Sequence, residues 1–97
     1  MVAGLSESEA TRIAKALGDP IRLRTYSEIA AHKEICVGSL KVCEVVSHAT
    51  VSHHLRVLSQ AGLLSSHRSG QYIFYRVIPS RLVAYRRYLS RLGKPSA

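Results

Sequence analysis

The side chains best suited to chemistry lie in one short stretch of the chain. Residues 48–56 read His-Ala-Thr-Val-Ser-His-His-Leu-Arg. On a helix, Val51, Leu55 and Leu58 share an apolar face that His54 joins, which makes His54 a structural side chain rather than a ligand. Small polar side chains on the opposite face let a helix approach base edges in the DNA major groove. The predicted DNA contacts on this helix are His48, Thr50, Ser52, His53 and Arg56.

A basic hairpin is predicted directly after this helix. Ser69 and Gly70 separate two alternating runs, and glycine permits the positive φ of a tight turn. Arg68 and Gln71 lie beside the turn and are candidates for contacts to phosphates or to the minor groove. A reading helix followed by a basic hairpin predicts a winged helix-turn-helix.

Capping signals place the other elements. Ser6 and Glu9 form a capping box for a first helix that ends at Gly18, and Asp19 with Pro20 starts a second. We expect Ser39 to cap a third helix, Ser47 the reading helix, which ends at Gly62, and Pro79-Ser80 a last helix. Residues 35–37 are predicted as a brief strand or as the start of the third helix. The expected buried faces of the first two helices are Ala10, Ile13, Ala14 and Leu17, then Leu23, Tyr26, Ile29 and Ala30.

The expected fold is mainly α with a small β-hairpin wing, in a single domain over residues 1–97 with a flexible tail at 93–97. The last helix carries an apolar stripe that so small a domain cannot cover. We therefore expect a homodimer that joins through the first and last helices. The predicted interface residues are Ile13, Leu17, Leu82, Tyr85, Leu89 and Leu92.

Composition narrows the function classes. Fourteen Lys and Arg against six Asp and Glu give a net charge of +8, which favours a polyanionic partner. No Ser-His-Asp ordering, paired carboxylates or phosphate loop is present, so an enzyme is not expected.

No apolar run approaches the ~20 residues of a membrane span, and the first residues lack a signal-peptide layout, so a cytoplasmic protein with reduced thiols is expected. A protein-interaction module of the same fold is the alternative from another class, and the basic charge and polar helix face argue against it.

Three segments together resemble the ArsR/SmtB family of dimeric, metal-sensing transcriptional repressors. They are residues 16–24, residues 50–58 with 61–63, and residues 68–76. The resemblance implies a winged helix-turn-helix that binds an operator in double-stranded DNA as a dimer and is released by an inducer. It implies no cofactor for DNA binding itself.

The two cysteines are the candidate ligands for an inducer. Arsenic sensors of this family carry a Cys-Val-Cys motif at the head of the third helix, and here the matching tripeptide is Cys36-Val37-Gly38. The first thiol of that motif is present and the second is missing. Because thiolate is the soft ligand of this chain, we predict that As(III) or Sb(III) binds Cys36, with Cys43 as the second ligand. In one regular helix the two cysteines would lie ~10.5 Å apart along the axis, an obstacle that weakens if Cys36 precedes the helix.

Three alternatives for the inducer remain open at this stage. The thiols can respond to redox or persulfide signals, the regulator can be an orphan without a known ligand, or both cysteines can be small buried hydrophobes. Zinc is disfavoured, because the predicted last helix has neither Asp nor His.

Overall fold

The first two helices form where their capping signals place them. The computed structural model describes residues 4–95, so parts of the predicted N-terminal segment and tail lie outside it. Helix α1 spans Glu7–Leu17, with both hydrogen bonds of the Ser6–Glu9 capping box and its C-cap at Gly18. Helix α2 spans Pro20–Ala30, and the Asp19 carboxylate accepts the N–H of Arg22. Both predictions are confirmed.

The predicted third α-helix is wrong. After the short strand β1 (Ile35–Cys36), the chain makes two 3₁₀ turns, η1 (Val37–Ser39) and η2 (Lys41–Glu44). Ser39 caps nothing, and Leu40 in extended conformation separates the two turns. The Glu28 carboxylate on α2 accepts the N–H of Lys41 with both oxygens at 3.0 and 3.1 Å, which ties η2 to α2. Residues 35–36 are thus a strand, one of the two predicted options.

The reading helix and the wing follow as predicted. Helix α3 spans His48–Gln60, and the chain leaves it through Gly62 with φ of 80°. Strands β2 (Leu64–Ser69) and β3 (Tyr72–Val77) form the hairpin, with Gly70 at φ of 62° in the turn. β3 lies in the middle of the antiparallel sheet, between β1 and β2, and Cys36 faces Phe74 across it.

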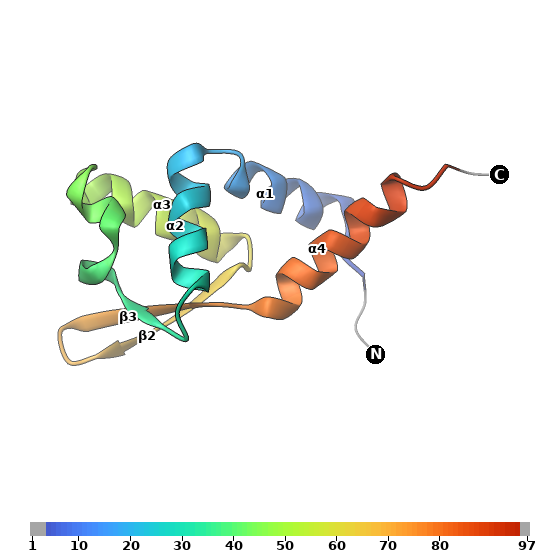
Figure 1. Ribbon diagram of the computed structural model, residues 1–97. Helices are drawn as coiled ribbons and strands as arrows, with labels where there is room; N and C mark the ends of the chain where they lie inside the picture. The colour runs from blue at the N-terminus through green and yellow to red at the C-terminus, as the bar shows by residue number, and fades with distance from the viewer. Residues whose placement is uncertain (1–3, 96–97) are drawn as a thin grey trace.

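Helix α4 (Pro79–Leu92) packs against the core through partly buried side chains, among them Leu82 and Tyr85. Pro79 is its first residue, but Ile78 occupies the N-cap without a side-chain bond, so the predicted role of Ser80 as a cap is wrong. None of the residues of α4 is fully buried. The wing and α4 lie at opposite ends of a molecule with extents of 54 × 28 × 21 Å (Figure 1).

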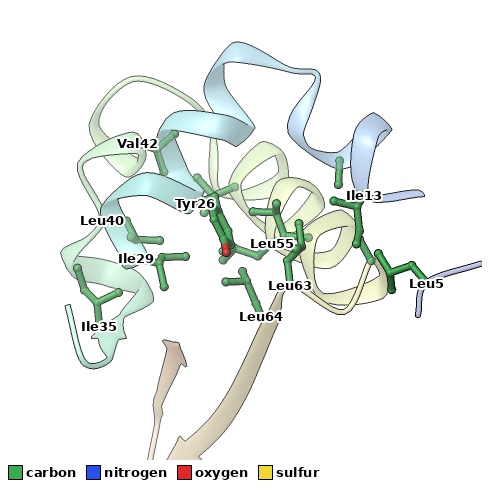
Figure 2. Close-up of a cluster of buried hydrophobic side chains, with 14 residues drawn as sticks. Leu5, Ile13, Tyr26, Ile29, Ile35, Leu40, Val42, Leu55, Leu63 and Leu64 are labelled. Carbon is green, nitrogen blue, oxygen red and sulfur yellow. The ribbon is translucent and has the colours of Figure 1, made fainter. Parts of the chain in front are cut away.

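The core sits between α1, α2, α3 and the base of the sheet (Figure 2). Ile13, Ile29, Leu58 and Leu63 are completely buried there. Burying such side chains supplies the main favourable free energy, about 1.5–3 kcal/mol each. The core fixes α3 against α2, so the polar face of α3 points outward.

Some predicted buried positions on α1 and α2 are wrong. Ala14, Leu23 and Ala30 are exposed, whereas Ala16 and Thr25 are buried instead. Thr25 is tolerated inside because its hydroxyl donates to the carbonyl of Ile21 at 2.8 Å. Within residues 4–95, each helix is too short or too polar to cross a membrane.

Candidate nucleic-acid interface

The geometry of α3 confirms the predicted division of its faces. Ser47 caps the helix by accepting the Thr50 N–H at 3.2 Å. Val51, His54, Leu55 and Leu58 are buried. The opposite face is exposed to solvent and carries His48, Ala49, Ser52, His53, Arg56 and Gln60. The helix therefore presents an exposed ridge of mainly polar side chains along its length, and a helix of this kind can enter a major groove.

A side-chain contact joins the wing to Glu34, the residue just before β1. His67 on β2 donates from Nε2 to the Glu34 carboxylate at 2.7 Å, and its ring stacks on Phe74 of β3 with centroids 5.3 Å apart. Arg76 on β3 donates to the hydroxyl of Ser65 on β2. The His67–Glu34 contact joins the hairpin to the segment just before β1, and the other two contacts lie within the hairpin.

An open groove of about 760 Å³ lies between α3, the wing and the segment that contains Cys36. Three predicted DNA-contacting residues line it together, Ser52 and Arg56 from α3 and Gln71 from the wing. Apolar side chains and the hydroxyls of Ser and Tyr residues form the remaining wall, and among residues 4–95 no carboxylate lines it. A groove with one guanidinium, several hydroxyls and no acid suits a phosphate-bearing strand.

The other predicted DNA residues lie beside this groove rather than in it. His48 and His53 are exposed on α3, and Arg68 is exposed on β2 opposite Ile73. Thr50 is half-buried, and its hydroxyl lies 3.0 Å from the hydroxyl of Ser47 at the cap. Thr50 therefore contributes to the helix start, and Ser52 and His53 are the freer side chains of the ridge.

Sequence reasoning missed five hydroxyl-bearing residues that line the groove, Ser39, Ser59, Ser66, Tyr72 and Tyr75. Ser59 lies seven residues after Ser52, a spacing of two helical turns that could have signalled it. Tyr72 is 54% exposed beside the turn of the hairpin. Ser39 lines the groove only because β1 pairs with β3, and the sequence does not reveal that pairing.

Arg22 joins three elements behind the reading helix. Its guanidinium donates to the carbonyls of Ala16 and Lys15 at the end of α1, at 2.6 and 3.1 Å, and to Nδ1 of His54 on α3 at 3.2 Å. Because a guanidinium only donates, Nδ1 of His54 must be unprotonated. Burial, assisted by Arg22 and His53, lowers the pKa of His54 despite the opposing effect of Asp19. His54 is thus a satisfied structural side chain, as predicted, and Arg22 is not an exposed charge.

Arg81 on α4 holds the far end of α3. It donates to the Glu9 carboxylate on α1 at 3.2 Å and to the carbonyl of Ala61 at 3.4 Å. Gly62 leaves the space for it, since a Cβ there would come within 2.6 Å of its Nε atom. The hydrogen bond from the Ser6 N–H, followed by the one from Arg81, lowers the pKa of Glu9. The reading helix is therefore tied to α1 at two points.

Cys36 ends strand β1, and Cys43 lies in η2, the second of the two 3₁₀ turns that follow it. Cys36 is half-buried on β1 and lines the groove. The Cys43 thiol on η2 donates to the carbonyl of Val37 at 3.2 Å, one residue beyond Cys36. Burial, with Glu28 and Glu44 nearby, raises the pKa of Cys43. In the part of the chain that the structure describes, no three side chains of His, Cys, Asp or Glu are arranged to hold a metal ion.

The structure corrects one member of the predicted dimer interface. Ile13 is 0% exposed in the core of its own chain, so it has no surface to offer a partner. Leu17, Leu82 and Tyr85 are partly buried against that core. Leu89 and Leu92 on α4 are 45% and 70% exposed. An uncovered apolar strip therefore remains on α4.

The chain is similar in sequence to known transcriptional regulators. The chain is 33% identical over 79 residues to an uncharacterized HTH-type transcriptional regulator of Methanocaldococcus jannaschii, covering 76% of this chain and 83% of that protein. It is 38% identical over 65 residues to an arsenic resistance transcriptional regulator of Pseudomonas putida, covering 67% of this chain and 51% of that protein. The chain belongs to the ArsR/SmtB family of transcriptional regulators. No protein-family model matches it.

Solved structures of similar proteins have the same fold as this ArsR/SmtB family member. An ArsR-like transcriptional regulator from a Rhodococcus species superimposes with a TM-score of 0.77 at 29% identity, covering 89% of this chain and 80% of that one. A homodimeric winged helix-turn-helix DNA-binding domain from Mycobacterium bovis superimposes with a TM-score of 0.69 at 22% identity, covering 95% and 91%. The chain spans about half the length of the arsenic regulator that it matches.

Proposed function

We propose that this ArsR/SmtB family member is a repressor that binds an inverted-repeat DNA operator with α3 and the wing. The observation that carries the proposal is the groove that brings Ser52, Arg56 and Gln71 together without a carboxylate. In this arrangement Ser52, His53 and His48 reach base edges in the major groove. Arg56, Arg68 and Gln71 contact the backbone, and Thr50 supports the helix start.

The test is a fluorescence-anisotropy titration of the DNA upstream of the chain's own coding sequence, against a random duplex of equal length. Ser52→Ala and His53→Ala should lower affinity for the specific duplex more than for the random one, because base contacts specify. Arg68→Ala should lower both alike, as loss of a phosphate contact does. If His53→Ala leaves the ratio of the two affinities unchanged, His53 does not read bases.

A homodimer is the second part of the proposal. The exposed Leu89 and Leu92, on a helix without a fully buried residue, give an apolar strip that a second copy can cover. The similar domain from Mycobacterium bovis is described as homodimeric. Two-fold symmetry then requires half-sites about one helical turn apart, or a multiple of that spacing. Leu89→Arg should give a monomer in sedimentation and lose tight operator binding. A wild-type chain that sediments as a monomer at micromolar concentration would refute the dimer.

The third part is a thiophilic inducer, As(III) or Sb(III), that binds Cys36 with Cys43 as its second ligand. Support comes from the position of Cys36 in the groove and from the contact of the Cys43 thiol with the carbonyl of Val37, the residue next to Cys36. The chain has two cysteines, so it supplies two thiols at most. Each arsenic–sulfur bond would form as a thiol proton leaves with an arsenite hydroxide as water.

The test measures release of the bound duplex on addition of arsenite. Cys36→Ser and Cys43→Ser should each keep DNA affinity and lose the response. Release that persists in both variants would place the inducer elsewhere. Release of wild type by peroxide or polysulfide but not by arsenite or antimonite would make the thiols redox sensors. If no thiol reagent acts, the cysteines are core residues and the inducer proposal fails.

A further inference from the structure

A second basic surface lies on the other side of the reading helix. A cleft of about 530 Å³ between α1 and α3 is lined by Arg12, Lys15, Val57 and Gln60. Arg12 and Lys15 are exposed on α1, and Gln60 is exposed at the end of α3. No residue of this cleft belongs to the groove that faces the wing.

The position of the cleft follows from helical periodicity. At 100° per residue, Gln60 stands almost directly above His53, and Arg56 lies between them on the same exposed ridge. Ser52 and Ser59 point to the wing side of that ridge, whereas Val57 points to the α1 side. The ridge of α3 is therefore flanked by the wing groove on one side and by the Arg12–Lys15 cleft on the other.

The charges in this cleft are available to a ligand. Within residues 4–95, the ion pairs are His67–Glu34 and Arg81–Glu9, and neither involves Arg12 or Lys15. No carboxylate lines the cleft. The acids of α1, Glu7 and Glu9, lie in its first turn, and Glu9 is engaged by Arg81 and by the helix cap. Two unpaired cations beside a glutamine amide form a site for an anion.

The chemistry of the anion follows from the shape of the DNA groove. The major groove is about 12 Å wide, which barely exceeds the 10–12 Å diameter of a helix with its side chains. A helix seated there has a phosphate strand along each flank. The wing groove serves one flank, and the cleft is the only cationic surface that α1 offers to the other, so far as residues 4–95 show.

We propose that Arg12 and Lys15, with Gln60, bind phosphates of the second DNA strand, opposite the strand held between α3 and the wing. This inference rests on the proposed function of α3 as the reading helix. It makes α1 part of the DNA-binding surface, so that the chain holds both edges of the major groove.

The experiment compares two double variants that remove the same charge. Arg12→Gln/Lys15→Gln neutralises the cleft, and Arg86→Gln/Arg87→Gln neutralises two exposed cations on α4. Affinity for the operator duplex and for a random duplex is measured over a series of salt concentrations. Circular dichroism and sedimentation check that both variants keep the fold and the oligomeric state of wild type.

The cleft variant should weaken binding to both duplexes by about tenfold, and each lost phosphate contact should reduce the slope of log affinity against log salt by about 0.9. The α4 variant should keep the wild-type slope, because its cations act only through the general field. Equal losses in the two variants, or an unchanged slope in the cleft variant, would overturn the proposal.

Neutral methylphosphonate linkages locate the contact on the DNA. Placed singly along each strand, they should weaken wild type at positions on the strand away from the wing, and the cleft variant should no longer respond there. If wild type responds only on the wing strand, the cleft proposal fails while the proposed function stands. If wild type shows no preference for any duplex and no response at any linkage, the proposed function itself fails.

Discussion

The contact between Arg22 and His54 makes a specific prediction for stability. Arg22→Met keeps the aliphatic stem and removes the guanidinium that bridges α1 and α3. Nδ1 of His54 would remain unpaired in a side chain that is only 7% exposed, which costs about 1–3 kcal/mol. The carbonyls of Lys15 and Ala16 lose about 0.5–1 kcal/mol each, because water replaces part of the interaction.

Together these losses give a decrease of about 2–5 kcal/mol in the free energy of unfolding. In a domain of this size that lowers Tm by roughly 10–25 °C. Urea titration followed by circular dichroism measures the change. Arg24→Met is the matched control, since Arg24 is exposed on the same helix, and it should stay within about 0.5 kcal/mol of wild type. Equal stabilities of the two variants would refute the bridging role of Arg22.

Three further predictions follow from single sites. Folding lowers the pKa of His54, so the unfolded chain binds a proton more readily than the folded one, and the stability that His54 contributes is fully present above its unfolded pKa of about 6.5 and falls as the pH drops below it. In His54→Asn, the free energy of unfolding from urea titrations should therefore change less between pH 7 and 5 than in wild type, and an unchanged pH dependence would contradict this. Gly62→Ala should destabilise the chain more than Gly70→Ala in thermal melts, because both have positive φ but only Gly62 faces Arg81, and equal losses would contradict that contact. Because the pKa of Cys43 is raised and the thiolate is the attacking form, the rate of arsenite-induced release should rise from pH 7 to 8.5 in stopped-flow anisotropy, and a flat rate would count against Cys43.

The parts of the fold that the sequence predicted are those set by local signals. Ser6, Asp19 and Ser47 each cap a helix through contacts within three residues, so short segments of sequence contain the whole interaction. Gly70 sets the hairpin turn in the same local way. The division of α3 into a buried and an exposed face followed from one helical period.

The parts that failed depend on contacts between distant residues. The segment after Ser39 forms 3₁₀ turns rather than an α-helix because β1 pairs with β3 on one side and Glu28 accepts the Lys41 N–H on the other. The groove beside Cys36 exists only because of that pairing. The roles of Arg22 and Arg81 depend on partners far along the chain, and nothing in their sequence context separates them from exposed cations.

The central claim is that the surface between α3 and the wing binds DNA, and the most direct measurement compares the DNA affinities of wild type and Arg56→Ala. Affinities for an operator duplex and for a random duplex are measured at one salt concentration near the physiological value. Wild type should prefer the operator by at least about 10³-fold. Arg56→Ala should bind both duplexes more weakly, as loss of a backbone contact does, while remaining folded by circular dichroism. A wild type without preference, or an Arg56→Ala variant with wild-type affinity, would contradict the account.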